Sequence, residues 1–291
     1  MRILVIGGTR FIGPRIIGIL AAQGHQVTVF HRGQHSTPLP PGVSQLTHPD
    51  AAMPVRKIPK EVLGIEPDVV LHMIAMGEED AEAAVAAFAG VAGRIVVPSS
   101  GDVYQAYGIF IGIEPGPPVP VPLAEDAPLR TVRFPYRKAD TPREALEFYY
   151  DKVLVEAAVS SRRDLPATIL RLPKVYGPED NRDLSTVYSF RQHPGWRWTH
   201  GFVDNVAAAI GLAVLDDRAA GKTYNVGEPS TPTVAERLRF LPDRPDHALF
   251  DKEANFEQDI VYDTSRIRRE LGYREVVDER KAMMNLLRGK L

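Results

Sequence analysis

The first residues of the chain constrain its fold more than any other segment. Residues 2–6, RILVI, form a short apolar run that is typical of a buried parallel strand. Gly7 and Gly8 end this run, and apolar residues with helical spacing follow from Phe11 to Ala22. A strand, a glycine turn and a helix in this order predict the first unit of an α/β fold.

The alternation of strands and helices continues along the chain. We expect further strands at 26–30, 43–46, 68–75, 94–100, 167–172 and 223–227. We expect further helices at 79–91, 144–160 and 203–215, and a charged helix from about residue 278. This order predicts a Rossmann-type, doubly wound parallel sheet with helices on both faces.

Residues 113–142 interrupt the alternation. The stretch IEPGPPVPVPLAEDAP at 113–128 carries six prolines in sixteen residues, so it cannot be the interior of a helix. Two interpretations stay open, a surface linker and a substrate lid or specificity loop. We favour the loop, because long irregular segments inside compact domains are often functional.

Composition excludes several chemistries. The chain has no Cys, which excludes disulfides, thiolate catalysis and Cys-ligated zinc or iron–sulfur clusters. The 35 basic and 37 acidic residues give a formal charge of -2, which argues against nucleic-acid binding by bulk charge. The eight histidines lack zinc-ligand spacing, so no metal is expected. No apolar run approaches the ~18 residues of a membrane span, and we expect a cytoplasmic protein without a membrane partner.

The loop after the first predicted strand suits a dinucleotide. A pyrophosphate needs backbone N–H groups at a helix N-terminus and no side chain that blocks its approach. Gly7 permits the tight turn, and Gly13 permits close packing of the helix on the strand. The alternative is a tight turn without a ligand. We expect the loop to bind NAD(P) through Gly7, Gly8, Thr9, Arg10, Phe11, Ile12 and Gly13.

Further motifs follow the loop in a characteristic order. They are SSGDVY at 99–104, LRLPKVYGP at 170–178, HGFVDNVA at 200–207, YNVG at 224–227, and DTS at 263–265 with LGY at 271–273. Together they resemble the extended or atypical short-chain dehydrogenase/reductase superfamily, the NAD-dependent epimerase/dehydratase family. Arg10 stands where that family has glycine. The variant GGTRFIG resembles the chloroplast stem-loop-binding branch and related bacterial proteins.

The resemblance implies a division of the chain and a reaction. It implies a Rossmann domain over 1–173, with 113–142 as an insertion loop, and a smaller substrate-binding subdomain over 174–291 that is partly interleaved with it. It implies hydride transfer at a carbon of a sugar nucleotide or a related hydroxy or keto substrate, and a homodimer is a further expectation. The alternative is a non-catalytic NAD(P)-binding scaffold or an RNA-associated protein.

The end of the second predicted strand bears on the choice of cofactor. NAD-preferring members of the family carry an acid there, but this chain has His31 and Arg32, and no acid lies between Val29 and Pro49. A guanidinium suits a 2′-phosphate better than a ribose diol, so NADP is favoured over NAD. The alternative is that both side chains point into solvent. Asp50 follows the third strand near the place where the family has an adenine-binding acid.

The resemblance also implies a proton-transfer site that lacks one member. In the family, a Tyr exchanges a proton with the substrate, a Lys four residues later supports it, and a Ser orients the substrate. Lys152, followed by Glu156, matches the lysine, and Ser100 matches the serine. Four residues before Lys152 stands Phe148, which has no proton to exchange.

Three interpretations of the missing tyrosine stay open. A helix distortion brings Tyr149 or Tyr150 into the site, or another group such as Asp102, Tyr104 or His72 takes the role. In the third interpretation, the protein binds NAD(P) without turnover. The resemblance further implies cofactor contacts at Ala75, Ser99, Lys152, Pro173 and Val175.

Overall fold

The computed structural model describes residues 1–34 and 38–290. The chain divides into two compact units. Unit 1 comprises Met1–Ser100, Arg133–Arg171 and Ala207–Tyr224, and unit 2 comprises Gly101–Val132, Leu172–Val206 and Asn225–Leu291. The chain therefore passes between the units several times. The division into a Rossmann domain over 1–173 and a substrate-binding subdomain over 174–291 stays a prediction.

A seven-stranded sheet carries the fold. Its strands are β1 (Arg2–Ile6), β2 (Gln26–His31), β3 (Ser44–Thr47), β4 (Val69–His72), β5 (Arg94–Ser100), β6 (Ala167–Leu172) and β9 (Thr223–Asn225). Their order is β3-β2-β1-β4-β5-β6-β9, and the pairings from β3 through β5 are parallel. This order confirms the prediction of a Rossmann-type parallel sheet. The connections leave β1 in opposite directions, so the switch point of the sheet lies between β1 and β4.

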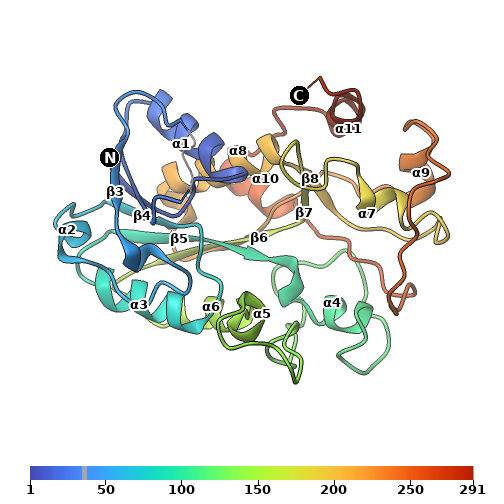
Figure 1. Ribbon diagram of the computed structural model, residues 1–291, viewed down its shortest axis with the longest axis horizontal. Coiled ribbons are helices and arrows are strands. Elements are labelled where there is room, and N and C mark those ends of the chain that lie inside the picture. Colours follow the sequence, from blue (N-terminus) through green and yellow to red (C-terminus); the bar gives the residue numbers. More distant parts are fainter. Residues whose placement is uncertain (35–37, 291) are drawn as a thin grey trace. The chain divides into compact units, whose positions relative to one another are not determined.

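Helices cover both faces of this sheet (Figure 1). On one face lie α1 (Ile12–Ala22) and α8 (Val203–Leu215), and on the other lie α3 (Glu78–Phe88) and α6 (Lys152–Val159). A Cβ added at Gly211 of α8 would lie 3.2 Å from Ile19 of α1, so these helices pack closely. The opposite face buries strand residues against the small and branched side chains of α3 and α6, among them Leu4, Ile6, Val70, Ala81, Ala84, Val155 and Val159.

The prediction of one helix over 144–160 is wrong. The segment forms α5 (Leu146–Tyr149), a break, and then α6. The break arises because Asp151 is the N-cap of α6, with an extended backbone and a side chain that accepts a hydrogen bond from the N–H of Val153 at 3.0 Å. The same carboxylate accepts from the N–H of Phe134 at 2.7 Å. A capping aspartate therefore starts a new helix at this point.

The Pro-rich segment lies between α4 (Gln105–Phe110) and α5, and no helix or strand is assigned to 111–145. This confirms that it is not the interior of a helix. Its unit 2 part is tied down by Glu114, whose carboxylate accepts from Thr131 Oγ1 at 2.8 Å and from the N–H of Val132 at 2.7 Å. Whether the segment is a linker or a substrate loop stays a prediction.

Unit 2 is built around a parallel strand pair, β7 (Lys174–Tyr176) and β8 (His200–Phe202). Sequence reasoning placed its last helix, α11 (Glu279–Leu287), but missed α9 (Val234–Leu238) and α10 (Ser265–Leu271). The short elements η1 (Pro49–Ala51), α2 (Lys60–Leu63), η2 (Gly101–Val103), α7 (Ser185–Tyr188) and η3 (Asp217–Ala219) complete the chain. Within the described residues, no helix combines the length and apolar character that crossing a bilayer requires.

Candidate active site

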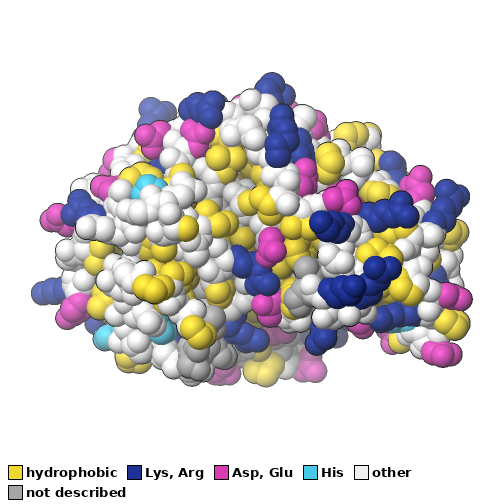
Figure 2. All heavy atoms as spheres, turned by 90° about the horizontal axis from the view of Figure 1, so that it is seen from above, with side chains coloured by type: hydrophobic (Ala, Val, Ile, Leu, Met, Phe, Trp, Pro, Cys, Tyr) yellow, Lys and Arg dark blue, Asp and Glu magenta, His cyan; other side chains and the backbone are white. Residues whose placement is uncertain are grey.

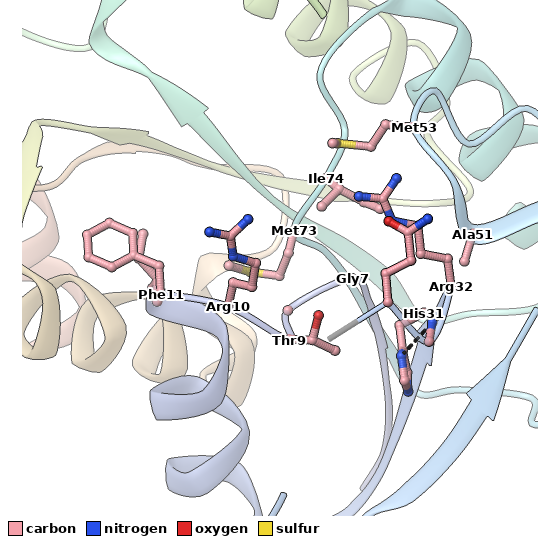
Figure 3. Close-up of a pocket in the computed structure, with 14 residues that line it drawn as sticks. Gly7, Thr9, Arg10, Phe11, His31, Arg32, Ala51, Met53, Met73 and Ile74 are labelled. Carbon is pink, nitrogen blue, oxygen red and sulfur yellow. Dashed lines mark hydrogen bonds between the residues drawn. The ribbon is translucent and has the colours of Figure 1, made fainter. Parts of the chain in front are cut away.

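A cavity of about 270 Å³ lies in unit 1 where β1 and β2 end (Figure 3). One side of it is the glycine loop, and another is the segment that follows β2. Gly7, Gly8, Thr9, Arg10, Phe11, Ile12, His31 and Arg32 line it together with Gly33, Gln34, Ala51, Met53, Met73 and Ile74. The structure therefore brings most of the predicted cofactor-binding residues of unit 1 together at the switch point of the sheet.

The glycines of this loop are required by its backbone. Gly7 and Gly8 adopt φ of 81° and 78°, in the left-handed region that side-chain-bearing residues rarely enter. A Cβ at Gly13 would lie 2.1 Å from the carbonyl oxygen of Gly8, so no other residue fits there without movement. The loop is thus a cradle bare of side chains at the start of α1. This geometry fits the pyrophosphate of a dinucleotide.

The next two loop residues differ in role. Phe11 precedes α1 with φ 52° and ψ -106°, a strained backbone for a non-glycine residue. Its carbonyl accepts a hydrogen bond from Arg15 Nη1 at 2.8 Å, which helps to hold this conformation. Arg10 is exposed, and its side chain lies beside Met73 in Figure 3. Its guanidinium is accessible to an anion at the cavity.

His31 and Arg32 also differ in role. His31 is 7% exposed, and its Nδ1 accepts from the N–H of Gly33 at 3.2 Å. Its Nε2 therefore carries the proton and faces Gln45 Oε1 at 3.0 Å. Both ring nitrogens of His31 are thus engaged within the protein. Arg32 is exposed and lines the cavity, so of these two residues it is the one whose side chain is accessible to a ligand.

One wall of the cavity is apolar. Ala51, Met53 and Ile74 lie on the Arg32 side in Figure 3 and form a surface suited to the flat face of an aromatic base. Asp50 is not among the residues that line the cavity. Its N–H instead donates to His48 Nδ1 at 3.1 Å within the turn after β3.

Lys152 lies buried at the start of α6 and is 5% exposed. Its Nζ donates to the carbonyl oxygens of Ala75 at 2.7 Å and Pro98 at 3.0 Å, beyond β4 and within β5. One turn further along α6, the Glu156 carboxylate accepts from Ser99 Oγ at 2.6 Å and pairs with Arg171 at 2.8 Å. Ser99 and Arg171 therefore hold α6 against the sheet. Ala75 contacts Lys152 through its backbone carbonyl oxygen.

The aromatic residues before Lys152 point to different partners. The ring centroid of Phe148 lies 4.1 Å from the guanidinium of Arg137. The backbone of Tyr149 is close to Gly77, where an added Cβ would lie 2.5 Å from the Tyr149 carbonyl oxygen. Burial raises the pKa of the Tyr149 phenol, and the nearby charge of Asp80 adds to this rise. The ring centroid of Tyr150 lies 6.0 Å from Lys152 Nζ.

The other candidates for proton transfer are placed as follows. His72, at the end of β4, is fully buried, and burial with the nearby charge of Lys152 lowers its pKa to about 3. Tyr104 is also fully buried and donates to Asn225 Oδ1 at 2.6 Å, which gives it a structural role. Asp102 is 4% exposed, and its carbonyl accepts from Arg130 Nε at 3.1 Å. Ser100 ends β5 in unit 1.

Two further predicted contacts belong to unit 2. Pro173 and Val175 follow β6, and Val175 lies in β7. Their contact with a cofactor stays a prediction. Over 1–34 and 38–290, no three acidic or histidine side chains are grouped so that they could hold a metal ion.

The fold and the glycine-loop cavity define a Rossmann-type α/β protein. No family model matches the chain, and no curated protein matches its sequence. Solved structures do match it over nearly its whole length. At 16–20% identity, these matches confirm the fold that the resemblance in the sequence implies.

Three of these structures illustrate the likeness. The Bordetella bronchiseptica enzyme WbmG, in complex with NAD, matches with a TM-score of 0.68 at 18% identity, covering 99% of this chain and 93% of WbmG. MoeE5, in complex with UDP-glucose and NAD, matches with a TM-score of 0.67 at 18% identity, covering 99% and 98%. The UDP-glucose 4-epimerase of Thermotoga maritima, with UDP-glucose, matches with a TM-score of 0.67 at 16% identity, covering 99% and 98%.

Proposed function

We propose that this chain is an NAD(P)-dependent oxidoreductase that acts on a sugar nucleotide, by epimerisation, dehydration or reduction of a ketone. The observation that carries the proposal is the pairing of a buried lysine, Lys152, with an aromatic hydroxyl residue, Tyr150, whose ring centroid lies 6.0 Å from the lysine Nζ. The fold shared with WbmG bound to NAD and with MoeE5 bound to UDP-glucose and NAD supports the same kinds of ligand for this chain.

The cavity of unit 1 supplies the cofactor site in this proposal. The bare backbone from Gly7 to Gly13 receives the pyrophosphate, and the apolar wall that includes Met53 and Ile74 receives the adenine. Arg32 binds a 2′-phosphate, held at the end of a strand that His31 anchors, so NADP is preferred over NAD. The bound nicotinamide supplies the acceptor and donor of hydride.

Tyr150 takes the role of the absent tyrosine in this proposal. The cap at Asp151 ends the helical geometry before Lys152, so the residue nearest to the lysine need not stand four positions earlier. Phe148 is stacked on Arg137, and its side chain has no proton to exchange. Tyr149 is disfavoured, because burial and Asp80 both oppose formation of its phenolate. Ser100 orients the substrate oxygen, and Asp102 is an alternative proton-transfer group.

Two measurements test the proposal together. Cofactor-stripped protein is titrated with NADPH and NADH by calorimetry, and is then incubated with UDP-glucose and UDP-glucuronic acid in the presence of the preferred cofactor. We expect micromolar binding of NADPH, weaker binding of NADH and formation of a new sugar nucleotide. Tight binding without turnover of any sugar nucleotide would refute the enzymatic proposal.

A second candidate function, a non-catalytic NAD(P)-binding protein, rests on the same segment. Phe148 is stacked, and Lys152 Nζ is engaged by two carbonyl oxygens. The surface does not favour RNA as the partner of such a protein. On the face drawn in Figure 2, Lys and Arg side chains are interspersed with Asp and Glu, in keeping with the formal charge of -2. Turnover of a sugar nucleotide would decide against this candidate.

A further inference from the structure

Unit 2 contains a cavity of its own, of about 410 Å³. Its walls come from β8, from the loop that follows β9, and from the start of α11. Phe240 and Tyr273 contribute aromatic surface to it, and Glu228, Glu275, Asp278 and Glu279 contribute carboxylates. All residues that line this cavity belong to unit 2, so binding of a ligand in it does not depend on hydride transfer in unit 1.

Among the residues that the structure describes, none donates a hydrogen bond to one of the two carboxyl oxygens of Glu228. The residue is 4% exposed, and its Oε1 accepts from the N–H of His200 at 3.1 Å and from Nη2 of Arg237. Within residues 1–34 and 38–290, Oε2 has no hydrogen-bond partner. A buried carboxyl oxygen left in this way destabilises the fold unless something donates to it.

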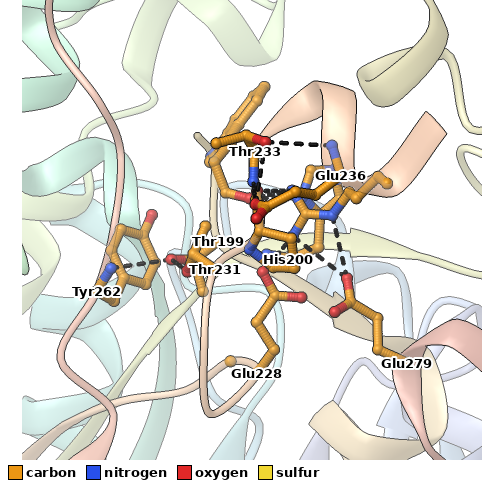
Figure 4. Close-up of polar contacts among 12 residues, drawn as sticks. Thr199, His200, Glu228, Thr231, Thr233, Glu236, Tyr262 and Glu279 are labelled. Atoms are coloured by element: carbon orange, nitrogen blue, oxygen red, sulfur yellow. Dashed lines mark hydrogen bonds and ion pairs between the residues drawn. The ribbon is translucent and has the colours of Figure 1, made fainter. Parts of the chain in front are cut away.

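Glu279 brings a second carboxylate to the same place. It belongs to the first turn of α11, its side chain is 18% exposed, and Oε1 lies 3.3 Å from Nη2 of Arg237. The carboxyl groups of Glu228 and Glu279 point toward one another (Figure 4). Arg237 cannot move to serve them further, because it is 1% exposed and also donates to the carbonyl oxygens of Trp198 and Pro232 at 3.1 Å. Two carboxylates therefore share one guanidinium.

The other acids of the cavity are accounted for by the protein. Glu275 pairs with Arg268, and Asp278 caps α11 by accepting from the N–H of Lys281 at 2.9 Å. The guanidinium of Arg280 lies 5.2 Å from the ring centroid of Phe240. The carboxyl groups that the protein leaves available to a ligand are therefore those of Glu228 and Glu279.

The surroundings of this pair select the class of ligand. An anion is repelled by the carboxylates. No group of three acidic or histidine side chains that could hold a metal is found among the described residues, and hard cations need several oxygen ligands. The cavity also offers carbon surface from Phe240, Tyr273 and Pro232, and such surface beside a carboxylate pair suits a cation that carries both N–H groups and carbon. We propose that this cavity binds a small organic ammonium ion, whose N–H groups donate to Glu228 Oε2 and to the Glu279 carboxylate.

Binding of such a cation is coupled to the release of a proton. Burial raises the pKa of Glu228 well above its ordinary value, and Glu279 adds to the rise, while Arg237 and the backbone N–H of His200 lower it. Tyr176, whose own pKa is raised by burial, also faces this group of charges. The raised pKa favours the protonated form of Glu228 when no ligand is bound. The ammonium ion takes the place of that proton, which passes to the buffer.

The test is a calorimetric titration of the full chain at pH 7 with butylammonium chloride and, in parallel, with the neutral analogue 1-butanol. The titration is repeated in two buffers of different ionisation enthalpy, so that proton release is counted. We expect saturable binding of butylammonium at least tenfold tighter than that of 1-butanol, with release of up to one proton. Equal binding of the two probes, or binding of Mg²⁺ in place of the amine, would overturn the proposal.

Variants locate the site. Glu228→Gln keeps an acceptor for Arg237 and should weaken butylammonium binding at least tenfold and abolish proton release. Glu279→Gln is the second test, because its more exposed side chain makes loss of folding less of a concern. The control is Glu257→Gln, an exposed acid of unit 2 that does not line the cavity, and it should leave binding unchanged. Folded variants at 228 and 279 that bind butylammonium as the parent does would refute the assignment.

Discussion

The guanidinium of Arg137 lies 4.1 Å from the ring centroid of Phe148, and Arg137 Nε donates to the Phe148 carbonyl at 2.5 Å. The same guanidinium also lies 3.6 Å from the ring centroid of Phe134. Phe148 is thereby held by a partner of its own. Its side chain does not follow the helical alignment with Lys152 that the sequence spacing suggests.

The stacking of Phe148 leads to a prediction for a restored tyrosine. Phe148→Tyr should change kcat by no more than about twofold, because the added hydroxyl belongs to a ring held by Arg137 and not to one aligned with Lys152. Steady-state kinetics with the sugar nucleotide that turns over will check this. A gain of tenfold or more would mean that position 148 reaches the reacting centre after all.

Tyr150 should behave in the opposite way. Tyr150→Phe removes the hydroxyl and keeps the ring near Lys152 Nζ, so kcat should fall by about 10²–10⁴, the usual contribution of a positioned acid or base. Calorimetric binding of the cofactor should be retained. Tyr149→Phe is the matched control and should keep most of the activity. If Tyr149→Phe abolishes turnover while Tyr150→Phe does not, the assignment of Tyr150 is wrong.

The choice of cofactor should depend on Arg32. Arg32→Ala should weaken NADPH binding by about 10- to 100-fold, as expected for loss of a charge-assisted contact, and should leave NADH binding within about threefold. Titrations at low and moderate salt will measure both effects. Arg10 is a second exposed cation that lines the same cavity, so Arg10→Ala is the comparison variant. A parallel loss of NADH and NADPH affinity in Arg32→Ala would contradict 2′-phosphate recognition.

Two glycines near the start of the chain should respond differently to alanine. Gly13→Ala places a Cβ 2.1 Å from the carbonyl oxygen of Gly8, so it should lower the unfolding free energy and abolish cofactor binding. Gly18 lies in the same helix and has no atom within 4 Å of an added Cβ. Gly18→Ala should therefore stabilise the protein by about 0.5–1 kcal/mol. Urea unfolding measures the unfolding free energy of both variants. An equal change in the two variants would contradict this prediction.

His72 should make stability depend on pH. Its folded pKa of about 3 lies below the ordinary 6.5, so the folded state disfavours the charged ring. The stabilisation is complete above pH 6.5 and is lost as the pH falls toward 3. Between pH 6.5 and pH 5 the loss from His72 should be about 2 kcal/mol, from 1.36 kcal/mol per pH unit. Urea unfolding of the parent and of His72→Leu should show a shallower decline in the variant, and parallel curves would rule the effect out.

Regular elements could be predicted from the sequence because their signals are local. The strand from Arg2 to Ile6, the helix from Val203 to Leu215 and the start of α11 follow directly from apolar runs, from spacing and from the capping Asp278. The helix α9 was missed, although Thr233 and Glu236 form a capping box that is visible in the sequence.

The candidate site was predictable only in part. Glycine spacing located the loop, because left-handed backbone and close approach restrict the residue type. The different roles of His31 and Arg32 were not visible, since they depend on Gln45 of a neighbouring strand. The pairing of Glu228 with Glu279 was missed as well, because it joins residues far apart in the chain.

The cap at Asp151 has a consequence for how chains of this kind are recognised. A comparison that assumes helical pitch across 148–152 places Phe148 on the same helix face as Lys152. At Asp151 the backbone is extended, and distances along the sequence no longer report which side chains share a face.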